Sequence, residues 1–97
     1  MTSAQLKSSA ETDAQLPRGL SREAQSLWFI KKGDWEAAHN IAQDIETPLG
    51  SWLHALLHLI EGDLGNARYR FAEAGRPVEK PSQIDELWDE IAVVVLK

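Results

Sequence analysis

The feature that most constrains the fold is a Gly-Asp step that occurs twice, 29 residues apart. Gly33-Asp34 and Gly62-Asp63 each interrupt stretches in which apolar residues recur every three to four positions, the spacing of one helix face. Glycine readily takes the left-handed conformation that ends a helix, and an aspartate side chain accepts a hydrogen bond from the first turn of the next helix. The two steps therefore predict consecutive helices joined by tight turns.

The periodicity predicts five helices and no strand. The expected helices are residues 20–32, 35–45, 48–61, 64–74 and 82–96. Pro48 suits a first helical turn, and helix 48–61 is the most apolar, so we expect this helix in the middle of the fold. The valines near the C-terminus favour strands, but their spacing continues the last helix and no second strand exists to pair with them.

The N-terminal segment differs in composition from the rest of the chain. Residues 1–19 are rich in Ala, Ser, Thr and Gln and have little apolar surface to offset the entropy of ordering. They are expected to form a disordered or loosely attached tail, or a segment that folds on a partner. Residues 20–97 are expected to form a single helical domain.

The sequences around the two Gly-Asp steps also match each other. The matching pairs are Leu27 with Leu56, Ile30 with Leu59 and Ala38 with Ala67. Internal similarity with a period of 20–50 residues is typical of stacked helical hairpins.

The second unit, Ala55-x2-His58-x8-Ala67-x3-Phe71-x2-Ala74, resembles the tetratricopeptide repeat in its alternation of small and large residues. The first unit, Ser26-x2-Phe29-x8-Ala38-x3-Ala42-x2-Ile45, matches only the first half of that pattern, because its last two positions exchange sizes. The period is also shorter than the usual length of about 34 residues.

The resemblance covers about residues 20–77 and implies an all-α fold of two antiparallel hairpins, with the last helix capping this short solenoid. The chain also resembles small bacterial tetratricopeptide-like proteins without assigned activity. That similarity rests on Gly33-Asp34-Trp35-Glu36 with His39, on Trp52-x-His54-Ala55-x2-His58-x2-Glu61-Gly62-Asp63 and on Asn66-Ala67. It supports the architecture and implies no mechanism.

Composition excludes several classes of function. The formal charge of −5 argues against nucleic acids and anionic membranes as partners. The lack of cysteine excludes disulfides, thiol nucleophiles and cysteine-ligated metals. No segment has the roughly 18–20 apolar residues of a membrane span, and the N-terminus lacks a secretory signal pattern, so we expect a cytoplasmic protein. No phosphate-binding glycine loop or nucleophile elbow is present, so an enzyme is the less favoured interpretation.

Two histidines are spaced for a common ligand. His54 and His58 are four residues apart, so they share a helix face with the spacing of a two-histidine metal pair. Ala55 stands where the zinc-protease pattern requires glutamate. His39 or Glu61 would complete a metal site, since zinc takes three or four ligands. The alternatives are an exposed or groove-lining polar face and histidines buried for packing.

Aromatic and basic residues supply further candidates. Three of the four tryptophans lie on predicted core stripes: Trp28, Trp35 and Trp88. Trp52 begins the central helix, where it is a candidate for the mouth of a groove. Arg68 and Arg70 lie off the apolar face of their helix, where they either bind an acidic peptide or form a solvated face with ion pairs.

These patterns predict a non-catalytic module that binds a protein or peptide. Its groove is expected between helices 20–32 and 48–61, and the candidate partner or ligand residues are Phe29, Trp52, His54, His58, Arg68 and Arg70. The alternative is a small-molecule or metal-binding protein, even a weak hydrolase, whose candidate ligands are His39, His54, His58 and Glu61. No cofactor other than such a metal is expected.

A stack of two hairpins leaves apolar faces at its ends unless a cap or a second chain covers them. Val93 and Leu96 point away from the main apolar stripe of the last helix. They are therefore the candidate contacts for a homodimer or for a partner in a larger complex.

Overall fold

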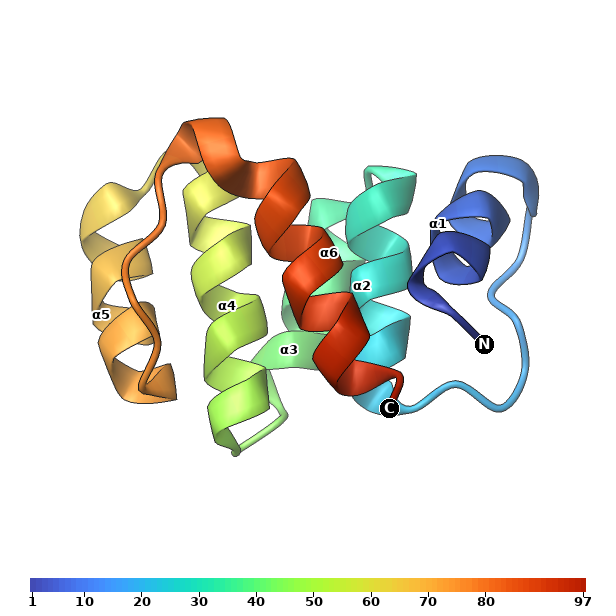
Figure 1. Cartoon of the computed structure of the whole chain (residues 1–97), viewed down its shortest axis with the longest axis horizontal. Coiled ribbons are helices and arrows are strands. Elements are labelled where there is room, and N and C mark those ends of the chain that lie inside the picture. The colour runs from blue at the N-terminus through green and yellow to red at the C-terminus, as the bar shows by residue number, and fades with distance from the viewer.

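The computed structural model describes residues 1–97 and is entirely helical. Its helices are α1 (Ser3–Thr12), α2 (Arg22–Lys32), α3 (Trp35–Gln43), α4 (Pro48–Glu61), α5 (Leu64–Ala74) and α6 (Ile84–Val95), with a 3₁₀ turn at Pro81–Gln83. Helices α2 to α5 follow one another as antiparallel neighbours, and α6 lies obliquely across α2 and α4 (Figure 1). None of these helices combines the length and the apolar character needed to cross a membrane.

The two Gly-Asp steps form the same turn, as the sequence predicts. Gly33 and Gly62 have φ angles of 90° and 85°, in the left-handed region that favours glycine. The side chains of Asp34 and Asp63 each accept a hydrogen bond from the backbone N–H three residues further on. The α2–α3 and α4–α5 turns therefore lie at the same end of the molecule, at the top of Figure 1.

Helix α4 is the centre of the core, again as predicted. Its fully buried apolar residues are Trp52, Leu53, Ala55, Leu56, Leu57 and Leu59. It packs against α2, α3, α5 and α6, which explains why its apolar residues cover so much of its circumference.

Helix α6 does more than cap the end of the stack. Its Leu87, Trp88 and Ile91 are buried, and Trp88 Nε1 donates a hydrogen bond of 2.9 Å to the carbonyl of Leu27 on α2. The surface between α2 and α4, where the sequence predicts a groove, is thus occupied by α6 (Figure 1). The sequence pattern of the two hairpins does not predict this crossing. The loop before α6 reverses the path of the chain, and its sequence does not indicate in which direction the helix returns.

The N-terminal segment corrects the predicted helix count from five to six. Helix α1 lies in the stretch expected to be a tail, yet its Leu6 and Ala10 are buried in the same core as α2 and α6. Ser9 Oγ also accepts a hydrogen bond of 3.1 Å from Trp28 Nε1. The composition of α1 is polar, so its stability comes from this docking surface, which the segment's own sequence does not reveal.

The two candidate dimer contacts on α6 differ in exposure. Val93 is 53% exposed, whereas Leu96 is partly buried and packs against the core. Leu96 therefore offers less surface to a second chain than Val93 does, because part of its side chain packs against the protein's own core.

Candidate metal centre

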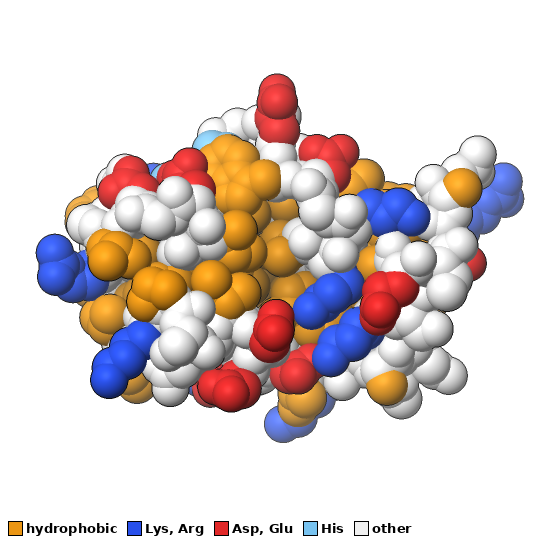
Figure 2. Space-filling view, turned by 90° about the horizontal axis from the view of Figure 1, so that it is seen from above, with side chains coloured by type: hydrophobic (Ala, Val, Ile, Leu, Met, Phe, Trp, Pro, Cys, Tyr) orange, Lys and Arg blue, Asp and Glu red, His pale blue; other side chains and the backbone are white.

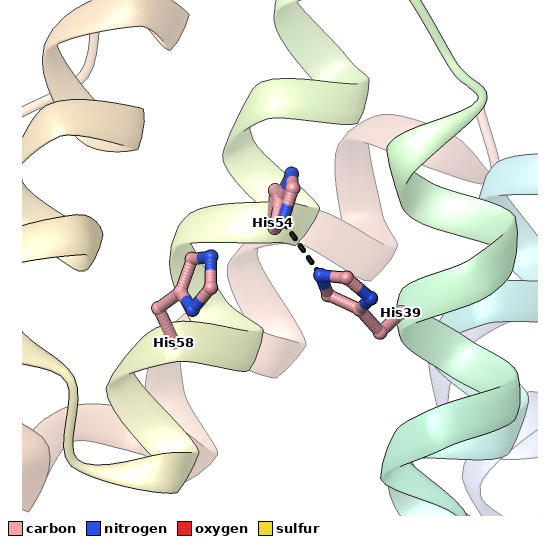
Figure 3. A group of neighbouring side chains, drawn as sticks. All are labelled: His39, His54 and His58. Atoms are coloured by element: carbon pink, nitrogen blue, oxygen red, sulfur yellow. Dashed lines mark hydrogen bonds between the residues drawn. The ribbon is translucent and has the colours of Figure 1, made fainter.

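Three histidines from two helices come together on one side of α4. His54 and His58 lie one turn apart on α4, and His39 faces them from α3, the antiparallel neighbour (Figure 3). One ring nitrogen of each lies within 4.8 Å of those of the other two, and the Nε2 atoms of His39 and His54 are 2.9 Å apart. The structure thus brings His39 to the pair that the spacing on α4 identifies.

Neighbouring side chains fix the orientation of two of the rings. Glu61 Oε1 lies 2.6 Å from His58 Nδ1, which leaves Nε2 as the free nitrogen of that ring. The indole of Trp35 stacks on His39 with 4.7 Å between ring centroids, and its Nε1 donates to the carbonyl of Leu57 on α4 at 2.8 Å. Trp35 therefore holds His39 against α4.

Burial favours the neutral form of two of the three histidines, His39 and His54. The side chain of His54 is only 6% exposed, and this burial, reinforced by the charge of Arg70, lowers its pKa to about 4. Burial also lowers the pKa of His39, with the neighbouring His58 as the next cause. Two neutral imidazoles satisfy the close contact between His39 and His54, since one Nε2 donates its proton to the other.

A cluster of this composition is suited to a transition metal. Neutral imidazole nitrogens bind zinc at about 2.0–2.1 Å, which places two ligand nitrogens about 3.4 Å apart in a tetrahedral site. The Nε2 atoms of His39 and His54, at 2.9 Å, lie somewhat closer together than that, and one nitrogen of His58 lies within 4.8 Å of both rings' nitrogens, so small side-chain movements would be needed to bind an ion. Three protein ligands leave a fourth position open, as in catalytic zinc sites.

A second acidic group overlaps this cluster. His58, Glu61 and Asp63 also lie close enough to share an ion, but both carboxylates are exposed. Asp63 caps α5 and accepts hydrogen bonds from Asn66, which lower its pKa. Local helix capping therefore accounts for the position of Asp63.

A pocket of about 400 Å³ adjoins the cluster on the side of His54. It lies between the α3–α4 connection, the first turns of α4 and one face of α5. Across it, Glu73 Oε1 accepts hydrogen bonds of 2.9 Å from Ser51 Oγ and from Arg70 Nη1, which lower the pKa of Glu73. Ser51 and Glu73 are 22 residues apart and share no motif, so no local pattern identifies them as partners.

The remaining sequence candidates are dispersed. Trp52 is buried, with the guanidinium of Arg76 lying 3.9 Å from its ring centroid, so it does not line a groove. Phe29 packs edge-on against Trp28 and borders neither the pocket nor the histidines. Arg70 lines the pocket, whereas Arg68 is exposed outside it.

No protein-family model, curated protein or solved structure matches this chain. The histidine cluster and the adjoining pocket are therefore the features from which a function can be inferred.

Proposed function

We propose that the protein binds one divalent transition-metal ion of the zinc class through His39, His54 and His58. The observation that carries this proposal is the convergence of three imidazole nitrogens within 4.8 Å, each held on a helix. Sites on packed helices hold ligand geometry more closely than sites on loops.

The third histidine distinguishes a metal site from simple packing. His39 and His54 satisfy each other by one hydrogen bond, but Nε2 of His58 has no hydrogen-bond partner in the protein. Glu61 on the opposite nitrogen matches the arrangement in which a carboxylate orients a metal-binding histidine and makes it more basic. An ion at the centre of the cluster would take one nitrogen from each ring and replace the hydrogen bond between His39 and His54, and the lowered pKa values of these two residues reduce proton competition near pH 7.

The direct test is a titration of untagged, chelator-treated protein with cobalt(II) and with zinc. We expect one ion per chain and the visible absorption typical of cobalt in a four-coordinate site. His39→Gln, His54→Gln and His58→Gln should each abolish the absorption while helicity, measured by circular dichroism, is kept.

The orienting carboxylate provides a graded test with a matched control. Glu61→Gln should weaken zinc binding by about 10–100-fold, the usual cost of losing such a partner. Glu90→Gln, an exposed position on α6, should leave zinc binding unchanged. Equal affinities for wild type and all three histidine variants would show that the cluster is not a metal site.

We propose binding of a protein partner by tetratricopeptide-like hairpins as a second function. Since α6 covers the face between α2 and α4, the supporting observation is at the end that carries the two Gly-Asp turns. Ile60 and Leu64 are 38% and 47% exposed there, beside a small apolar hollow lined by Ile30 and Trp35. Figure 2 views the molecule from this end and shows apolar side chains gathered between charged ones.

The second function is tested by affinity capture with a double variant at this end and a single-substitution control on α6. Ile60→Gln combined with Leu64→Gln should lose the partners that wild type captures, whereas Val93→Gln on α6 should keep them. Capture of the same proteins by all three would contradict a binding surface at this end.

A further inference from the structure

The starting point is an unpaired nitrogen on His54. A histidine that binds a metal through one nitrogen almost always donates the N–H of the other to a carboxylate, a carbonyl or water. For His58 that acceptor is Glu61. If His54 binds the ion through Nε2, the nitrogen that faces His39, its proton must reside on Nδ1, and no protein group accepts a hydrogen bond from it. Nδ1 is not among the buried atoms that lack a partner, so solvent reaches it.

An acceptor for the His54 Nδ1–H group can reach it only from the pocket. His54 is almost completely buried, and the surface it retains lies in the wall of the 400 Å³ pocket. Pockets of about 300–1,000 Å³ hold small molecules. Water in the pocket can accept from His54 Nδ1–H, and a small molecule with an acceptor group can replace that water.

Arg70 lines the same pocket and is a second hydrogen-bond donor. Arg70 Nη1 is bonded to Glu73, but Arg70 Nε is buried and has no hydrogen-bond partner. An orphaned buried N–H is costly, so a movement of the Arg70 side chain that brings Nε to an acceptor in the pocket would be favourable. Guanidinium groups bind carboxylates and phosphates particularly well, because their N–H groups match the spacing of oxyanion oxygens.

The charges around the pocket explain why the ion is needed. Glu73 balances Arg70, and Glu46 adds a further negative charge to the lining. Without metal, the pocket therefore offers no net attraction to an anion. A divalent ion on His54 adds two positive charges and polarises the Nδ1–H that faces the pocket.

We infer that the pocket binds the oxyanion group of a small molecule, a carboxylate or a phosphate, through His54 Nδ1–H and Arg70, when the metal is in place. This inference rests on the proposed metal site and names the class of ligand that the site takes with its ion. Binding is reciprocal, so the oxyanion also tightens the metal.

The test is a nuclear magnetic resonance titration of ¹⁵N-labelled protein with sodium acetate and, separately, with inorganic phosphate. We expect the backbone amides of Ser51 and Gly50 to shift, with affinity at least about tenfold higher in zinc-saturated than in chelator-treated protein, within the usual range of such coupling. The probe that binds more tightly identifies the group as carboxylate or phosphate.

Equal affinity with and without zinc would overturn the inference, as would the absence of shifts at Ser51 and Gly50. Shifts restricted to the three histidines would also overturn it, since they would place the anion on the ion itself. If zinc fails to bind, the proposed function fails as well. Normal zinc binding without pocket shifts rejects the ligand inference alone.

Two arginine variants on α5 distinguish binding in the pocket from a general effect of the protein's charge. In zinc-saturated protein, Arg70→Gln should weaken acetate or phosphate binding by about tenfold or more. Arg68→Gln removes the same charge from an exposed position outside the pocket and should leave binding unchanged. Equal weakening by both variants would show that the anion responds only to overall charge, which contradicts the inference.

Discussion

Gly50 lines the pocket, and its lack of a side chain allows the backbone of Ile45 to pass close to α4. It lies in the first turn of α4, where the chain arriving from α3 folds back closely on the helix. A Cβ at this position would stand 1.9 Å from the carbonyl oxygen of Ile45, an impossible distance unless the backbone moves. Gly65, also in the first turn of a helix, has open space around the same position.

The contrast between these two glycines predicts opposite effects of alanine. Gly50→Ala should lower the free energy of unfolding by about 1–3 kcal/mol, the usual cost of overpacking. Gly65→Ala should raise it by about 0.5–1 kcal/mol, because alanine favours the helix and nothing obstructs its methyl group. Urea denaturation of both variants checks the pair, and a stabilising Gly50→Ala would contradict the close approach of Ile45.

His54 predicts how stability depends on pH in metal-free protein. Its pKa is about 4 in the folded state against 6.5 for an ordinary histidine, so the unfolded chain binds more protons between these values. The contribution is complete above pH 6.5 and is lost as the pH falls towards 4. It amounts to at most about 3 kcal/mol. His39 shifts in the same direction and adds to the effect.

Urea denaturation at several pH values between 7 and 4.5, with chelator present, measures this dependence. We expect wild type to lose stability steadily over the range and His54→Gln to lose markedly less. Parallel curves for the two proteins would mean that His54 takes up its proton equally well in the folded and unfolded states.

At the scale of the element, α1 is the helix for which sequence and structure disagree. The sequence predicts a loose tail, in which truncation of a leucine has almost no effect on stability. In the structure Leu6 is fully buried, between α1 and the rest of the core. The stability of one leucine variant therefore distinguishes the two descriptions.

Leu6→Ala should lower the free energy of unfolding by about 2–5 kcal/mol, as expected for a leucine in a packed core. The matched control is Leu64→Ala on α5, a half-exposed leucine that should cost far less. A loss below about 0.5 kcal/mol for Leu6→Ala would favour the tail, because surface changes fall in that range.

Over the whole molecule, the proposed ion would join α3 to the central helix. Since the unfolded chain lacks a preformed site, binding stabilises the fold. Zinc at 100 times its dissociation constant should add about 2.7 kcal/mol, and each kcal/mol raises the melting temperature of a domain this size by about 4–8 °C. Thermal melts with zinc, with excess chelator and with magnesium, which prefers oxygen ligands, provide the measurement.

We expect the upward shift with zinc alone and its reversal by chelator. An unchanged melting temperature at saturating zinc would argue against a site formed by the folded state. Because α6 packs on α2 and α4, and α1 packs on α2 and α6, the shift should appear as a single cooperative transition of the whole chain.

The helices between residues 22 and 74 follow from the sequence because their signals are local. A left-handed glycine and an aspartate cap act within one turn, so Gly33-Asp34 and Gly62-Asp63 specify their turns without help from distant residues. The apolar surface of α4 likewise identifies it as the central helix. The pair His54 and His58 is local in the same sense.

Contacts between residues on different helices were decided by tertiary packing. The sequence made His39 a candidate third ligand, but only the packing of α3 on α4 places it next to His54. The contact of Ser51 with Glu73, the docking of α1 and the path of α6 over α2 and α4 had no local signal. The physical reason is that helix periodicity indicates which face is buried, whereas the partner of that face depends on rotation and crossing angle, which the whole core determines.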